Sequence, residues 1–217
     1  MDMTPLILSL KAAAVATVLV ILTGIPVSYL AARMKRGKSI VDVICTLPMV
    51  LPPTVVGFFL LLLFGKNSML GAWLMAHGIP VVFSQTGMVI ASAVVSFPLL
   101  YRTARGAFEQ VNPDVLSAGR TLGMSEWNIF WKVQMPIAWP GVISGAVLAF
   151  ARGLGEFGAT AMIAGNIRGK TRTLPLAVYS AVASGKMDDA GQYVVILVGI
   201  SFIVVVCMNY FSMERKG

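Results

Sequence analysis

The chain has 217 residues, of which 57% are hydrophobic and only 12% are charged, and its mean hydropathy is +0.83. Soluble domains carry about 25% charged residues, so the composition excludes a soluble domain and indicates several membrane-spanning helices. Lysine and arginine number 17 against 9 acidic residues. Because these basic residues cluster in short segments between apolar runs, their excess indicates the positive-inside rule of membrane proteins rather than nucleic-acid binding.

Five apolar runs are long enough to cross the hydrocarbon core, which takes about 20 helical residues. In chain order they occupy 6–32, 41–64, 80–101, 137–163 and 193–211. The sequence therefore predicts an all-α membrane bundle of five spans, forming one domain over residues 1–217. A sixth span through the shorter apolar run 174–184 is left open. We expect that run to form a re-entrant or interfacial helix within the outer connection 165–191.

The basic residues between the runs predict the orientation. Five spans place the two ends of the chain on opposite faces, and ten lysines and arginines fall on one face, which is then cytoplasmic. They are Arg33, Lys35, Arg36, Lys38, Arg102, Arg105, Arg120, Lys132, Arg215 and Lys216. The N-terminus is expected outside and the C-terminus in the cytoplasm.

The polar segment 102–136 predicts two short helices joined at a glycine. Asn112 can cap a helix that begins at Pro113, and Gly123 can end it in the left-handed conformation. Ser125 can cap a second helix, which is expected to stop by Pro136 because the residue before a proline disfavours helix.

The second of these helices is expected to carry Trp127, Phe130 and Trp131 on one face. Two interpretations remain open. The aromatic residues can anchor an interfacial helix at the level of the lipid headgroups, or the helix pair can present a compact knob to a cytoplasmic partner.

Arg152 and Glu156 are the ionisable residues deepest in an apolar run. They are four residues apart and therefore share one helical face, and charges inside a membrane are candidates for function. Either the two neutralise each other and position the fourth span, or Arg152 contacts a passing anion.

The sequence contains no Gly-x4-Gly-Lys-Ser/Thr loop, so the chain is not expected to bind ATP phosphates itself. It also lacks His-Glu-x2-His, paired aspartates and a serine–lysine arrangement for chemistry inside a membrane. We predict that the chain is not an enzyme and has no catalytic residue, metal site or cofactor of its own.

The segment from Ser117 to Pro136 resembles the coupling loop of the membrane subunits of ABC importers. That loop follows the pattern Glu-Ala-Ala, three residues, Gly, nine residues, Ile-x-Leu-Pro, and the spacing to Gly123 and Pro136 matches in full. Ser117 stands where the family often has Glu, and Gly119 stands at the second Ala.

The resemblance extends over almost the whole chain and is closest to permease subunits of the molybdate/tungstate type. It is carried by residues 47–57, 96–99, 151–160 and 171–175. Sulfate and thiosulfate permeases are similar at 155–158 but less so at 47–57, so they remain the alternative. From another class, a passive anion channel is the rival.

The resemblance implies the permease bundle fold, a prokaryotic plasma membrane, and a pathway formed with a second copy of the chain. It also implies two cytoplasmic ATPase subunits that bind ATP and Mg²⁺, and an extracytoplasmic oxyanion-binding protein. The expected ATPase-coupling residues are Ser117, Ala118, Gly119, Arg120, Thr121, Leu122, Gly123 and Pro136. Candidates for contact with the binding protein are Arg168, Lys170 and Arg172.

Overall fold

The computed structural model describes residues 2–213, and within them every regular element is a helix. Arg215 and Lys216, two of the ten basic residues that predicted the orientation, lie outside the described residues. The elements are α1 (Thr4–Arg33), α2 (Lys38–Val50), α3 (Pro53–Phe64), α4 (Met69–Ala76), α5 (Gln85–Glu109), α6 (Pro113–Thr121), α7 (Glu126–Ile129), η1 (Phe130–Gln134), α8 (Met135–Leu154), α9 (Gly158–Ile163), α10 (Leu174–Ala183) and α11 (Met187–Met213).

Four helices of the described chain are long and apolar enough to cross a membrane, and a bent pair can supply a fifth span. The four are α1, α5, the continuous helix Glu126–Leu154 and α11, and the bent pair is α2 with α3. The predicted all-α bundle of about five spans is therefore confirmed. The ten residues of α10 extend only about 15 Å, too short for a sixth span.

The second predicted span, 41–64, corresponds to a bent pair of helices, because α2 and α3 meet at an angle of 111°. Leu51 and Pro52 both have extended backbone conformations, with ψ of 143° and 134°. Each precedes a proline, which disfavours the helical conformation, and neither proline has an N–H to donate. Pro26, Pro48 and Pro98 instead lie inside helices.

The fourth predicted span, 137–163, is also broken. Helix α8 ends at Leu154 and the short helix α9 begins at Gly158. The two breaks lie against each other, because a Cβ atom on Gly57 of α3 would lie 2.8 Å from Cα of Ala159 in α9. A Cβ on Gly158 would similarly lie 3.0 Å from Cβ of Pro53. This approach leaves no room for side chains, so the crossing depends on both glycines.

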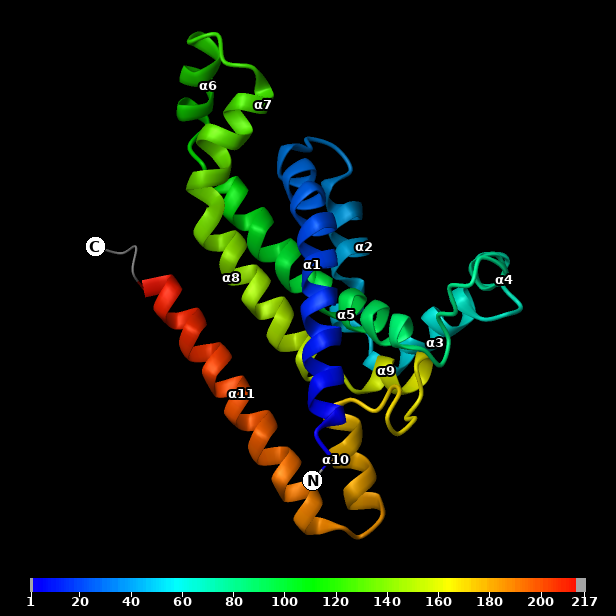
Figure 1. Cartoon of the computed structure of the whole chain (residues 1–217). Coiled ribbons are helices and arrows are strands. Elements are labelled where there is room, and N and C mark those ends of the chain that lie inside the picture. Colours follow the sequence, from blue (N-terminus) through cyan, green and yellow to red (C-terminus); the bar gives the residue numbers. More distant parts are fainter. Residues whose placement is uncertain (1, 214–217) are drawn as a thin grey trace.

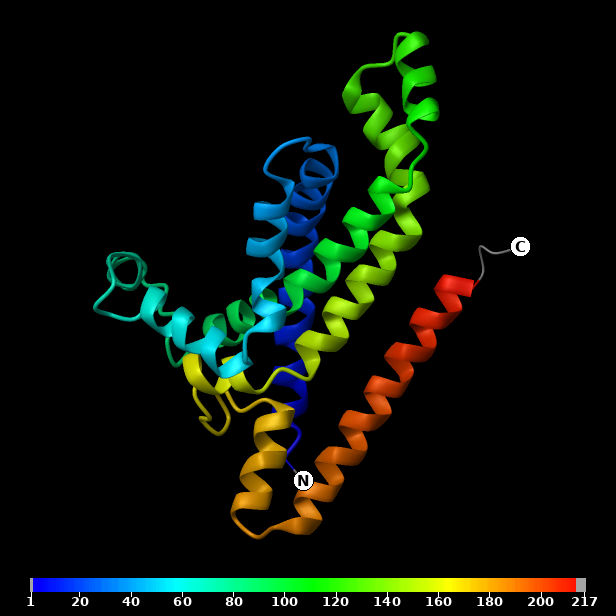
Figure 2. The same ribbon diagram turned by 180° about the vertical axis from the view of Figure 1, so that it is seen from behind.

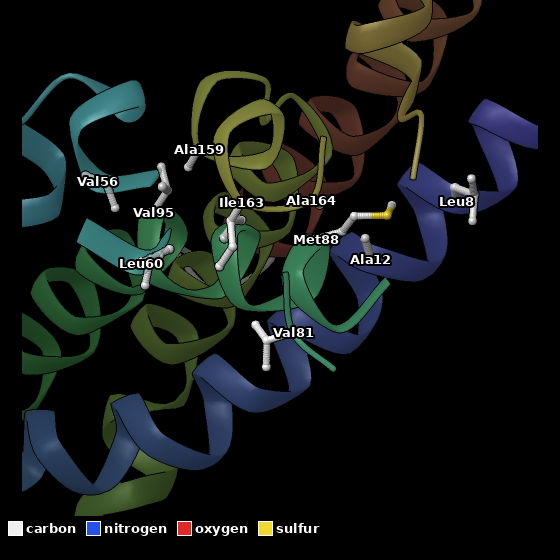
Figure 3. Close-up of a cluster of buried hydrophobic side chains, with 11 residues drawn as sticks. Leu8, Ala12, Val56, Leu60, Val81, Met88, Val95, Ala159, Ile163 and Ala164 are labelled. Atoms are coloured by element: carbon white, nitrogen blue, oxygen red, sulfur yellow. The ribbon is translucent and has the colours of Figure 1, made fainter. Parts of the chain in front are cut away.

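The core lies between α1, α5 and α8, which run side by side in both views (Figure 1, Figure 2). Small residues bring them close, since a Cβ on Gly141 of α8 would lie 2.5 Å from Cβ of Ala107 in α5. Near α9, a buried cluster joins α1, α3, α5 and α9 (Figure 3). A second cluster, around Leu100 and Phe108, packs α1, α5 and α8 toward α6.

The two ends of the molecule carry different elements. Helices α6 and α7 form one end, while the N-terminus and the hairpin of α10 and α11 form the other (Figure 1). Helix α11 stands apart from the bundle along most of its length (Figure 2), and only 6% of its apolar window is buried. Helix α2 has no buried residue. Apolar surfaces of this kind suit lipid or another membrane chain.

Candidate functional site: the α6–α7 element and the membrane ion pair

Helix α6 begins as the sequence predicts. The side chain of Asn112 accepts a hydrogen bond of 2.8 Å from the backbone N–H of Asp114, and Pro113 occupies the first helical position. A proline loses nothing there, because the first N–H groups of a helix have no partner within it.

Gly123 ends α6 in the left-handed conformation, with φ of +75°. Its N–H donates to the carbonyl of Arg120 at 2.9 Å, and the N–H of Met124 donates to the carbonyl of Gly119 at 3.1 Å. This pair of bonds is the Schellman motif, which satisfies carbonyls left over at the helix end. No heavy atom outside its immediate neighbours lies within 4 Å of a Cβ built on Gly123, so the glycine is required by backbone conformation rather than by space.

Helix α7 begins where predicted, since the hydroxyl of Ser125 accepts a 3.2 Å hydrogen bond from the N–H of Asn128. The prediction that this helix stops by Pro136 was wrong. A π-helical turn, η1, connects α7 to α8, and the N–H of Met135 donates to the carbonyl of Phe130. Pro136 then falls in the first turn of α8, where it is exposed, rather than in the knob formed by α6 and α7.

The continuous helix Glu126–Leu154 has 29 residues and is therefore about 44 Å long. A hydrocarbon core of about 30 Å covers only some 20 of these residues. The 20 residues of α8 fill that length, so α7 and η1 project beyond the membrane. One continuous helix thus connects α7 to the break after Leu154.

Helix α6 packs on α7 through Gly119. All residues of α6 are described by the structure, and Gly119 is the one among them that is buried. A Cβ on this glycine would lie 3.2 Å from Cγ1 of the buried Ile129. The other predicted coupling residues of α6 are exposed: Ser117, Ala118, Arg120, Thr121 and Leu122. Leu122 is 81% exposed.

The prediction of a single aromatic face was wrong for one residue. Phe130 turns inward, with its ring centroid 4.5 Å from that of Tyr29 in α1 and 6.1 Å from that of Phe108 in α5. Trp127 and Trp131 stay 70% and 49% exposed. The inward ring fixes the base of the knob to two spans.

Glu126 forms a bridge that the sequence analysis missed. One carboxylate oxygen accepts from Arg33 Nη2 of α1 at 2.6 Å and the other from Arg120 Nε of α6 at 2.7 Å. The hydrogen bonds from Arg120 and then Arg33 lower the pKa of Glu126 to about 2. Arg33 and Glu126 are 93 residues apart, and no local pattern pairs charges at that separation.

A second unpredicted network joins α2 to α5. The hydroxyl of Tyr101 donates to Asp42 at 2.5 Å, and Arg105 pairs with the same carboxylate. Glu109 accepts from both Arg105 and Lys38 at 2.7 Å. Arg105 and Lys38, which the sequence supplied only as orientation charges, therefore hold two helices together.

Arg152 and Glu156 form the ion pair that their spacing predicted, with Nη1 and Oε2 separated by 2.7 Å. The other carboxylate oxygen of Glu156 accepts a 2.8 Å hydrogen bond from the N–H of Ala159. Glu156 therefore connects the last turn of α8 to the first turn of α9 across the break. Its side chain is 1% exposed and that of Arg152 is 33% exposed.

The outer basic residues do not form one cluster. Arg168 approaches Asp2 at 3.5 Å, and Arg172 donates to the side chain of Asn166 at 2.8 Å. Arg168 and Arg172 line a hollow of about 120 Å³ with Lys186 and Asp189, whereas Lys170 is exposed and does not line it.

A family model described as "binding-protein-dependent transport system inner membrane component" matches residues 24–214. The chain belongs to this family. It is 40% identical over 217 residues to the molybdenum transport system permease protein ModB of Escherichia coli strain K12, covering 97% of this chain and 95% of that protein. It is 44% identical over 178 residues to ModB of Mycobacterium tuberculosis, covering 81% and 67%.

The fold matches a solved structure of the MetNI methionine ABC transporter in inward facing conformations, with a TM-score of 0.76 and 17% identity. That match covers 96% of this chain and 93% of the other. Family membership makes the chain a multi-pass component of the inner membrane, with a transport role rather than a catalytic one. A component of a binding-protein-dependent system works with other subunits.

Proposed function

We propose that this chain is the permease subunit of an ATP-driven importer of molybdate. The single observation that supports this best is the α6–α7 element, a capped knob at the end of the helix that runs into the broken region of the membrane bundle. The similarity to molybdenum transport permeases supports molybdate as the substrate.

The exposed side of α6 is the proposed docking surface for an ATPase subunit. Ser117, Ala118, Thr121 and Leu122 lie on that side, while Gly119 and Gly123 give the element its shape. Two copies of the chain would form one pathway, and ATP with Mg²⁺ would bind to two ATPase subunits. Closure of the ATPase pair would carry both knobs together and switch the pathway between inward-facing and outward-facing states.

The opposite end is the proposed docking surface for an oxyanion-binding protein. Arg168, Lys170 and Arg172 give it basic groups that can pair with acidic residues of such a partner. With α6 in the cytoplasm, the N-terminus lies outside the cell and α11 runs toward the cytoplasmic face.

Reconstitution into vesicles with the ATPase and binding protein of the same system tests the proposal. We expect molybdate uptake that needs ATP on the side of α6, needs the binding protein on the other side, and resists excess sulfate. Uptake without ATP or the ATPase would indicate a passive channel. Equal competition by sulfate would favour a sulfate or thiosulfate permease.

A further inference from the structure

Arg152 lines a cavity beside the break between α2 and α3. This cavity has a volume of about 180 Å³ and is lined by Arg152 and otherwise by apolar residues: Pro48, Met49, Leu51, Pro53, Val95 and Leu99. They come from both sides of the α2–α3 break, from α5 and from the last turn of α8. Arg152 is therefore the one polar side chain among the described residues lining this cavity.

Most of the hydrogen-bonding capacity of Arg152 is unused. A guanidinium has five N–H donors, and within the described part of the chain its partner is Glu156, through an ion pair of 2.7 Å between Nη1 and Oε2. The other side chains that line the cavity offer no acceptor, since they are hydrocarbon or thioether. Donors in such a place are satisfied by water or by an anion with several oxygens.

The ion pair determines how strongly such an anion would be held. Glu156 is 1% exposed, does not line the cavity and neutralises the charge of Arg152, whereas Arg152 is 33% exposed and lines the cavity. An ion in transit must bind well enough to enter and weakly enough to leave. A neutralised arginine meets both conditions, because it supplies directional donors without a net positive charge that would trap a dianion.

We propose that Arg152 is a transit contact for the tetrahedral oxyanion, and that Glu156 keeps this contact weak. This inference rests on the proposed function. It assigns the two residues opposite effects on retention of the anion: loss of Arg152 removes the contact, whereas loss of the charge on Glu156 strengthens it.

The test uses the complete transporter in vesicles, with molybdate as the probe, and compares Arg152→Gln, Glu156→Gln, the double variant and Arg36→Gln. Arg36 lies exposed in the turn between α1 and α2 and provides a matched loss of one arginine charge. Uptake per folded transporter and its inhibition by molybdate preloaded on the α6 side are both measured.

For Glu156→Gln we expect slower uptake and inhibition by preloaded molybdate at about tenfold lower concentration, the effect of strengthening one charge-assisted hydrogen bond. The double variant should fold normally, take up molybdate slowly and lose this inhibition. Arg36→Gln should behave as wild type.

Full uptake by the double variant, or unchanged inhibition in Glu156→Gln, would overturn the inference. If Glu156→Gln does not fold, the double variant still decides the question. If the unaltered transporter does not import molybdate with ATP, the proposed function fails instead, so the two failures are distinguishable.

Discussion

The α6–α7 element and the broken region around Arg152 are built in opposite ways. In the first, the helix boundaries follow from residues close in sequence: Asn112 caps α6, Gly123 ends it and Ser125 caps α7. In the second, the chain changes direction twice, and the breaks are held by contacts between α3 and α9, which are about a hundred residues apart. Local changes should therefore alter motion at the first and folding at the second.

The largest expected effect is from Gly57→Leu, which places a bulky side chain where a Cβ alone would lie 2.7 Å from Cβ of Met162. Overpacking a close helix crossing typically costs about 1–3 kcal/mol and sometimes more. We expect a clear loss of folded, monodisperse protein in detergent, measured by size-exclusion chromatography and thermal unfolding. Gly199→Leu is the control, because nothing lies within 4 Å of its Cβ position. Equal yields of the two variants would show that the crossing tolerates separation.

Gly123→Val should act on motion and leave the fold largely unchanged. A β-branched residue at φ of +75° is strained by about 1–3 kcal/mol, and the strain is confined to the turn between α6 and α7. We expect normal yield with most of the molybdate-stimulated ATP turnover lost. Gly78→Val, at φ of +74° with open space around it, imposes the same strain in the outer loop after α4. Full molybdate-stimulated ATP turnover in Gly123→Val would show that the turn between α6 and α7 is not needed for coupling.

Glu126→Gln should loosen the knob from α1 with a smaller effect. The pKa of Glu126 is lowered to about 2 in the fold, against about 4.3 in an unfolded chain. The carboxylate therefore contributes its bridge fully above about pH 4.3, and that contribution is lost as the pH falls toward 2.

At neutral pH we expect faster amide hydrogen exchange in α6 and α7 of Glu126→Gln, with the thermal midpoint nearly unchanged because exposed ion pairs contribute little to stability. Asp188→Asn, an exposed acidic residue in the first turn of α11, is the matched control. Exchange equal to wild type in α6 and α7 would show that the aromatic contacts of Phe130 alone hold the knob.

The smallest effect is expected from single cysteine substitutions that test the orientation of the chain in the membrane. In a chain with Cys45 and Cys207 replaced by serine, a cysteine at Asn67 should react with a membrane-impermeant reagent in intact cells. A cysteine at Lys35 should react only after permeabilisation, and transport should be unaffected in both. The reverse order would place α6 outside the cell and contradict the proposed ATPase docking surface.

The sequence by itself predicted the class, about five spans and the caps of α6 and α7, because composition, span length and helix caps are local properties. The Arg152–Glu156 pair was predictable for the same reason, since four residues of helix place both side chains on one face. The bridge through Glu126 and the network around Asp42 were not, because they join charges 93 and 63 residues apart.

Only the tertiary structure decided where helices break and where they continue. Pro52 and Pro53 end a helix, whereas Pro136 lies at the start of one that a π-helical turn joins to α7. A proline always removes a donor, but its effect on the chain depends on whether neighbouring elements compensate for the lost bond. The crossing of α3 and α9 brings together residues that meet only in the folded chain.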